Sequence, residues 1–140
     1  MNVYLDTSTI LRVLFGQKPI LREWASWDRA YTSELMGVEA RRTIDRLRLE
    51  RALDDDGVAE AHERLAAMEG TFAMVGLTRV VLGRAALPMA TSVKTLDALH
   101  LATALLLRES GIDDLAFATH DGQQATAARA FGFACLGVPS

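Results

Sequence analysis

Three features are scarce in this sequence: cysteine, long hydrophobic runs and an excess of charge of either sign. The 140 residues include one cysteine, Cys135, which excludes an internal disulfide and a cysteine-based zinc site. The longest apolar stretch, around residues 98–107, is interrupted by His100 and Thr103 and is well short of the ~18 residues of a membrane-spanning helix. The opening MNVYLD lacks the basic start and apolar stretch of a signal peptide. We therefore expect a soluble, cytoplasmic protein that does not contact membranes.

The charge and length set further bounds on the class of protein. The formal net charge is −3 and the sequence pI is about 5.6, so net charge alone gives no reason to expect nucleic-acid binding. Half of the residues are hydrophobic and 24% are charged, which is typical of a chain that folds around a core. No repeat, low-complexity segment or linker divides the chain. A single domain over residues 1–140 is expected.

Short apolar or β-rich runs alternate with longer helical patterns along the chain. Such alternation predicts an α/β fold with a central parallel sheet of about four to five strands flanked by helices. Helices are predicted at 8–15, 19–28, 34–50, 55–69, 78–87, 95–110 and 122–132, and strands at 2–5, 30–32, 71–77, 115–119 and 133–136. Ligands gather at the carboxyl ends of the strands in sheets of this kind, so acids there are of special interest.

Two aspartates directly follow predicted strands. Asp6 comes after the first strand, in YLDTST, and Asp121 follows the strand at 115–119, in ATHDGQQ. Each of them could simply cap the helix that comes next. If the two strands are neighbours in the sheet, both carboxylates face one crevice.

A third acid, Glu39, lies within the predicted helix 34–50. At about 100° per residue, Glu39 falls on the flank of the apolar face and away from the charged outer face. One interpretation is a boundary glutamate whose carboxylate reaches water. The other is a carboxylate directed toward a site beside the helix.

A fourth acid, Asp97, opens the most apolar helix of the chain, LDALHLATALLL. A carboxylate in the first turn is favoured by the helix dipole by ~0.3–1 kcal/mol. That preference explains an acid at this end, but not on a helix that is apolar nearly all round and therefore expected to be buried. A metal ion shared with Asp6 and Asp121 would explain it. His100, one turn later, is interpreted as a core histidine with satisfied hydrogen bonds.

Several carboxylates in one crevice repel one another and need a cation. With oxygen ligands only, the suitable ions are Mg²⁺ and Mn²⁺. A site of this kind can turn water into a nucleophile and neutralise the charge that develops on a phosphodiester, as metal-dependent nucleases do.

Four segments together resemble a known family: YLDTSTILR, SELMGVEARR, TLDALHLATALLL and FATHDGQQATAARAFGF, in this order. They are similar to PIN-domain ribonucleases, and most similar to the VapC-type toxins of bacterial toxin–antitoxin pairs. The resemblance spans the chain and implies a small three-layer α/β fold and a metal-dependent RNA endonuclease. It implies an acidic quartet of Asp6, Glu39, Asp97 and Asp121, a metal ion held by Asp6, Asp97 and Asp121, and supporting hydroxyls at Ser8 and Thr119. His120 is given no role.

The helix 34–50 and its extension carry five arginines within residues 41–51, namely Arg41, Arg42, Arg46, Arg48 and Arg51. A solvated face with ion pairs inside the helix is the favoured interpretation for Arg41 and Arg48. Arg42 and Arg46 lie nearer the side of Glu39, which makes them candidates for RNA phosphates or for an acidic partner segment. The aromatic residues Trp24 and Trp27 are interpreted as packing residues.

Three functions remain in competition. The first is an endoribonuclease toxin that binds RNA, forms a homodimer and is held inactive by a cognate antitoxin, all of which the resemblance implies. The second is a phosphatase of the haloacid dehalogenase type, with DTST as its nucleophile loop; such enzymes have a second acid two residues after the first, where this chain has Ser8. The third is a non-catalytic α/β binding module whose acids only cap helices.

Overall fold

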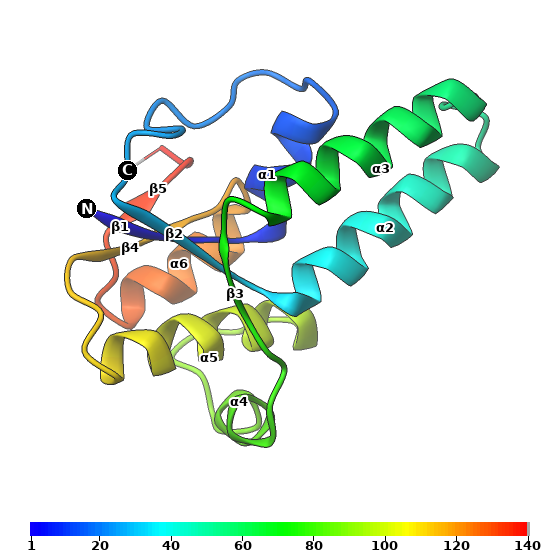
Figure 1. Ribbon diagram of the computed structural model, residues 1–140. Coiled ribbons are helices and arrows are strands. Elements are labelled where there is room, and N and C mark those ends of the chain that lie inside the picture. The colour runs from blue at the N-terminus through cyan, green and yellow to red at the C-terminus, as the bar shows by residue number, and fades with distance from the viewer. Residues whose placement is uncertain (140) are drawn as a thin grey trace.

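The fold is a parallel five-stranded sheet with helices on both faces, seen in a computed structural model that describes residues 1–139 (Figure 1). The strand order is β3-β2-β1-β4-β5, and every neighbouring pair is parallel. The strands are β1 (Asn2–Leu5), β2 (Arg29–Ser33), β3 (Ala73–Val75), β4 (Leu115–Ala118) and β5 (Cys135–Leu136). The helices are α1 (Thr7–Leu14), α2 (Glu34–Leu49), α3 (Asp55–Glu69), α4 (Arg79–Ala85), α5 (Thr95–Glu109) and α6 (Gly122–Ala130). The predicted three-layer α/β class is confirmed.

The alternation of side chains along β1 separates the core into two layers. Val3 and Leu5 pack on one face of the sheet with a cluster that includes Ile10 of α1 and Met36 of α2. Tyr4, between them, points to the other face. There it packs with residues of α5 and α6 and of the neighbouring strands, among them Leu101, Leu105, Phe117 and Ala127. Successive residues of a strand face opposite sides, so this one strand anchors both helical layers.

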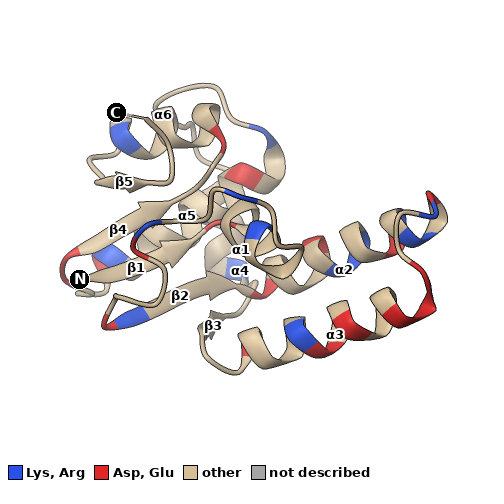
Figure 2. Ribbon diagram, turned by 90° about the horizontal axis from the view of Figure 1, so that it is seen from above, with Lys and Arg blue, Asp and Glu red and all other residues tan. Residues whose placement is uncertain are grey.

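Helices α2 and α3 form a hairpin that extends away from the sheet (Figures 1 and 2). Ser33 begins α2 by accepting a hydrogen bond from the Leu35 N–H at 3.0 Å, and Asp54 begins α3 by accepting one from the Gly57 N–H at 2.8 Å. Serine and aspartate are both favoured at this position, because their side-chain oxygens accept hydrogen bonds from the free N–H groups of the first turn. Arg41 joins the two helices through an ion pair with Glu69 at 2.6 Å.

The predicted helix at 19–28 is wrong, because this segment forms a series of turns. Ala25 has a φ of +66°, a left-handed conformation that a right-handed helix cannot include. The rings of Trp24 and Trp27 meet edge to face, with their centroids 5.1 Å apart, and pack on the core that faces α1 and α2. The packing role predicted for the two tryptophans is therefore confirmed, although they lie in a loop. Their packing on the core overrides the local helical pattern.

Helix α5 is less enclosed than its composition predicts. His100, Leu101 and Leu105 are buried, but Leu96 is 47% exposed. The helix therefore has one open side near its beginning, the end that carries Asp97. Over residues 1–139, α5 and the other helices are each too short or too polar to cross a membrane.

Gly137 allows the chain after β5 to pass close to the end of β4. Its φ is +96°, and a Cβ at this position would lie 2.5 Å from the carbonyl oxygen of Thr119 and 2.8 Å from Cδ2 of Leu21. Gly16, after α1, also has a positive φ of +65°, but a Cβ there would meet nothing within 4 Å. A comparison of alanine substitutions at the two glycines therefore separates the cost of backbone strain from the cost of steric conflict.

We expect Gly137→Ala to destabilise the protein more than Gly16→Ala does. Gly16→Ala should cost only the left-handed strain of about 1–2 kcal/mol, whereas Gly137→Ala adds a backbone collision that must displace Thr119. Urea unfolding of both variants measures the difference. Equal losses of unfolding free energy would show that the chain end moves away from Thr119 without cost.

Candidate functional site

The carboxyl ends of β1 and β4 lie side by side. Leu5 pairs with Ala118 in the parallel register, and the Asp6 N–H donates to the Ala118 carbonyl at 2.9 Å. Asp6 is thus placed next to Thr119, and Asp121 follows two residues later. The two strands are therefore neighbours, which is the condition under which both aspartates face one crevice.

The Asp6 side chain is held by hydroxyl groups. Asp6 occupies the position before α1, but its side chain makes no capping hydrogen bond. Its Oδ2 instead accepts hydrogen bonds from Thr119 Oγ1 at 2.6 Å and from Ser8 Oγ at 3.2 Å. The carboxyl is buried, with the residue 5% exposed. Ser8 and Thr119 therefore orient this carboxylate, as their predicted supporting role requires.

Asp121 is tied to the same residue and also caps a helix. Its backbone N–H donates to Thr119 Oγ1 at 3.0 Å. Its Oδ1 accepts from the N–H groups of Gln123 at 2.9 Å and Gln124 at 3.3 Å, at the beginning of α6. The capping interpretation of Asp121 is therefore correct for one carboxylate oxygen, and the residue remains at the crevice edge, exposed to solvent.

Glu39 of α2 is fixed by two donors from other elements. Its Oε1 accepts from Thr7 Oγ1 at 2.8 Å and lies 2.6 Å from His100 Nε2. The other ring nitrogen of His100, Nδ1, lies 2.6 Å from the hydroxyl of Tyr4. His100 is completely buried. The interpretation of His100 as a core histidine with satisfied hydrogen bonds is confirmed, and its partner is one of the predicted acids.

The pKa of Asp97 reflects the burial and the negative charge of the site. Burial, together with the charges of Asp6, Asp121 and Glu39, raises its pKa from 3.8 to about 6, while His100 acts in the opposite direction. The four predicted acids therefore lie close enough for their charges to interact. Gln124 joins the two sides of the crevice, because its side-chain N–H donates to the Asp97 carbonyl at 3.0 Å.

The donor set suits a hard divalent cation. Over residues 1–139, no group of three or more His, Cys, Asp or Glu side chains is positioned to hold a metal ion as it stands. The donors of Asp6, Asp97 and Asp121 are all carboxylate oxygens, which Mg²⁺ and Mn²⁺ prefer. The raised pKa of Asp97 reflects burial and uncompensated negative charge, and a cation would relieve the charge. The residues present therefore fit such an ion in their chemistry.

The arginines of α2 take part in surface ion pairs. Arg42 lies 3.2 Å from Asp45, and Arg46 lies 3.5 Å from Glu50; the arginine side chains are 71% and 61% exposed. Exposed pairs of this kind contribute about 0–1 kcal/mol, so both guanidinium groups can exchange partners. Arg48 forms the ion pair expected inside the helix, with Asp45. The same expectation was wrong for Arg41, which pairs with α3 instead.

Sequence reasoning missed Tyr4, Thr7 and Gln124 as parts of the site. His100 had a signal, because it lies three residues after Asp97 and so on the same side of α5. Thr7 immediately follows Asp6, but nothing in the sequence connects it with Glu39, 32 positions away. Such contacts become visible only when α1, α2 and α5 are packed together.

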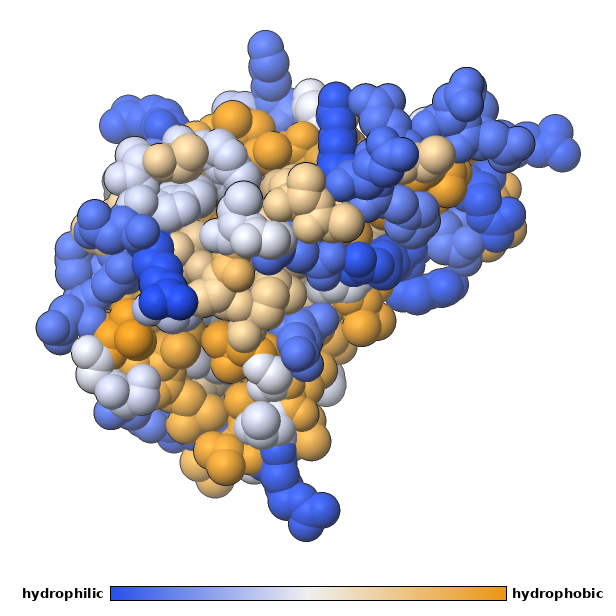
Figure 3. Space-filling model, viewed as in Figure 1, coloured by the Kyte–Doolittle hydropathy of each residue, from blue (hydrophilic) through white to orange (hydrophobic). Residues whose placement is uncertain are grey.

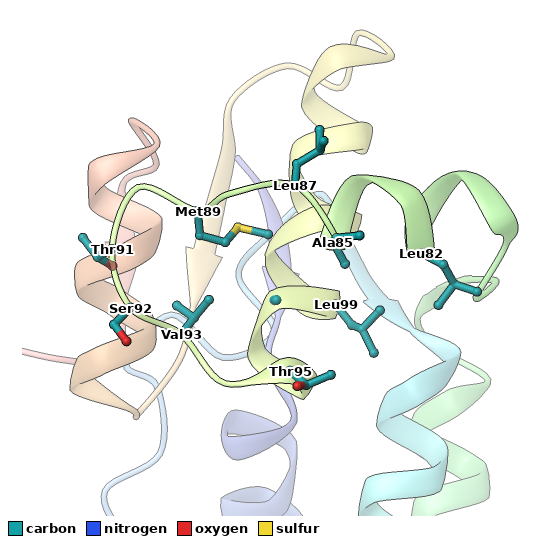
Figure 4. A pocket seen from close by; sticks show the side chains of 11 residues that line it. Leu82, Ala85, Leu87, Met89, Thr91, Ser92, Val93, Thr95 and Leu99 are labelled. Atoms are coloured by element: carbon teal, nitrogen blue, oxygen red, sulfur yellow. The ribbon is translucent and has the colours of Figure 1, made fainter.

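A cavity of about 600 Å³ lies near the beginning of α5. It differs from the acidic crevice because its lining is mainly apolar. Figure 4 shows Leu82, Met89 and Leu99 directed toward it from α4, the α4–α5 connection and α5. Thr95 also lines it, two residues before Asp97. The cavity offers apolar contact rather than charge, so it does not change the chemistry assigned to the carboxylates.

Comparison with known proteins places this arrangement in a family. No curated protein sequence matches the chain significantly. Among solved structures, the chain is similar to one in a toxin–antitoxin complex from Klebsiella pneumoniae, with a TM-score of 0.67 and 18% identity over 99% of this chain and 96% of the other. That likeness shows a shared fold. The family model described as the PIN domain matches residues 3–130, which include all four acids. The chain therefore belongs to the PIN domain family.

Proposed function

We propose that this protein is a metal-dependent endoribonuclease, the toxin component of a type II toxin–antitoxin pair. The observation that carries the proposal is the gathering of four carboxylates at the carboxyl edge of the sheet, where their charges and burial raise the pKa of Asp97 to about 6. PIN domains are nucleases. The similar solved structure comes from a toxin–antitoxin complex, which supports the toxin assignment.

In this proposal, Asp6, Asp97 and Asp121 would hold Mg²⁺ or Mn²⁺, which when bound lowers the pKa of water and stabilises charge on the phosphodiester. Ser8 and Thr119 keep Asp6 oriented through the hydrogen bonds to its Oδ2. Glu39 acts as the base. Its Oε1 is already occupied by Thr7 and His100, so Oε2 is the oxygen that accepts a proton from the attacking water.

The two alternatives have less support. The phosphatase reaction needs an acid at the position of Ser8, but the Ser8 hydroxyl donates to Asp6 instead. The binding module needs acids that only cap helices, but the Asp6 side chain makes no capping bond. The match to the PIN domain over residues 3–130 also favours a nuclease over both.

RNA would approach the crevice along α2. Arg42 and Arg46 are the candidate phosphate contacts, since both arginine side chains are exposed and their present ion pairs are weak. The net charge of −3 makes such local positive charge necessary if a polyanion is to bind near four carboxylates.

The proposed partners are a cognate antitoxin and a second copy of the chain. Figure 3 shows hydrophobic side chains gathered over the lower part of the molecule, where α4 and α5 lie in Figure 1. Four large exposed hydrophobic residues come from this region: Val80, Leu82, Leu87 and Leu96. Contiguous apolar surface of this kind is typical of interfaces, and we assign it to the homodimer. The proposal also places the protein in the cytoplasm, where RNA is available as a substrate.

Asp97→Asn tests the mechanism, because it removes one charge and keeps nearly the same shape. We expect RNA cleavage with Mg²⁺ or Mn²⁺ to be abolished. Without metal at pH 7, the variant should be more stable than the parent by about 1 kcal/mol, a value reduced to allow for the half-exposed carboxyl. Folding raises the pKa of the Asp97 carboxyl. This carboxyl should therefore make the parent less stable as the pH rises from 3.8 to about 6, and the variant should lack that loss.

Cleavage assays and thermal melting with and without Mg²⁺ provide the readouts. Mg²⁺ should raise the melting temperature of the parent and do less for the variant, because only the folded site binds the ion. Asp113→Asn, in the exposed connection between α5 and β4, is the matched control and should behave like the parent. If Asp97→Asn still cleaves RNA, and Mg²⁺ raises its melting temperature as much as that of the parent, then Asp97 is only a residue favoured in the first turn of the helix.

The charge reversals Arg42→Glu and Arg46→Glu should weaken RNA binding. If each arginine contacts a phosphate, each reversal should lower the slope of log K against log salt by about one. Binding is best measured in the Asp97→Asn background, where RNA stays intact. Arg48→Glu, on the outer face of the same helix, is the control and should leave the slope unchanged. Equal effects of all three reversals would indicate that RNA senses only net charge.

A further inference from the structure

Four side chains from four elements form one hydrogen-bonded chain inside the protein. It runs from Tyr4 of β1 to His100 of α5 and from there to Glu39 of α2. The hydroxyl of Thr7, in α1, is bonded to Glu39 and also lies 3.1 Å from Nε2 of His100. The distances are 2.6 Å from Tyr4 to His100, 2.6 Å from His100 to Glu39 and 2.8 Å from Thr7 to Glu39. Tyr4 and His100 are both completely buried. Glu39 is the partly exposed member, with its side chain 23% exposed, and His100 Nε2 also lies 3.7 Å from Oδ1 of Asp6.

The direction of these hydrogen bonds follows from which groups can donate. An ionised carboxylate only accepts, so His100 carries a proton on Nε2, the nitrogen that faces Glu39. Burial raises the pKa of Tyr4 well above 10, so its hydroxyl keeps its proton and is available to Nδ1. The Nε2–H reaches Glu39 whether the ring is neutral or charged. The orientation of Glu39 therefore does not depend on the titration of His100.

We propose that His100 is a positioning residue that fixes Glu39 for the chemical step, an inference that rests on the proposed function. Thr7 alone would leave the Glu39 carboxylate free to turn about one hydrogen bond. A second donor on the same oxygen, held in turn by Tyr4, restricts that motion and leaves Oε2 as the free oxygen. His100 touches neither water nor substrate in this role, because it is completely buried.

The burial of this network also argues for a role beyond packing. Buried polar groups cost free energy unless they are hydrogen-bonded, and apolar residues of similar size are often as stable. The surrounding positions of α5, such as Leu101 and Leu105, are apolar and buried. A leucine at position 100 would match these apolar neighbours, but it would leave the buried Tyr4 hydroxyl without its His100 partner and could not hold Glu39.

The test compares His100→Leu with His100→Gln, which restores an N–H donor of similar reach. We expect His100→Leu to lower kcat for RNA cleavage about ten- to a hundredfold, the range for groups that orient functional ligands, with KM changed less than about twofold. His100→Gln should recover most of kcat. Leu105→Ala, which weakens the same helix without contact to Glu39, should keep kcat at a temperature where all variants are folded.

A double mutant locates the effect. Glu39→Gln and the double variant Glu39→Gln/His100→Leu should have the same residual rate, because His100 acts through Glu39. A further tenfold loss in the double variant, or a His100→Leu enzyme with unchanged kcat, would overturn the proposal.

Crystal structures give a readout that does not depend on activity. In His100→Leu, the Glu39 side chain should occupy more than one rotamer, and in Leu105→Ala it should occupy one. If the parent fails to cleave RNA, the proposed function is wrong, and the structures alone decide the positioning role. A single, unchanged Glu39 rotamer in His100→Leu would overturn it.

Discussion

The parallel pairing of β1 with β4 imposes an electrostatic constraint on which the rest of the site depends. It aligns the carboxyl ends of two strands, and the aspartates that follow them share an edge with Asp97 and Glu39. Like charges held this close raise the free energy of the folded state. The fold tolerates that cost at one place because the sheet, packed on both faces, fixes the strand ends.

The protein controls these charges mainly with neutral donors. Within residues 1–139, Asp6 and Glu39 lie within 4 Å of Nε2 of His100, and none of the four acids forms an ion pair with lysine or arginine. Hydroxyl groups of Ser8 and Thr119 orient Asp6, and Thr7 and His100 orient Glu39. The hydroxyl bonds fix the carboxylates without adding positive charge. Burial lowers the pKa of His100, but Glu39 and Asp6 raise it overall, so His100 offsets only part of the negative charge. The negative potential that remains is what a divalent cation would need in order to bind.

The sequence predicted what depends on local pattern and missed what depends on packing. The strand ends at Asp6 and Asp121 follow from short-range rules and were found. The loop at 19–28 was predicted as a helix because its local pattern is helical. The prediction was wrong because the packing of two tryptophans on the core holds the segment in turns. The bond from Thr7 to Glu39 joins α1 to α2, and no periodicity within either helix could reveal it.

Titration of the Asp97 carboxyl by carbon-13 NMR tests the central claim most directly, since it measures the shared negative charge itself. The account predicts a pKa of about 6 in metal-free protein and a fall below the ordinary value of 3.8 when Mg²⁺ is saturating. A pKa near 3.8 that Mg²⁺ leaves unchanged would contradict the account, because Asp97 would then share neither a crevice nor a cation with the other acids.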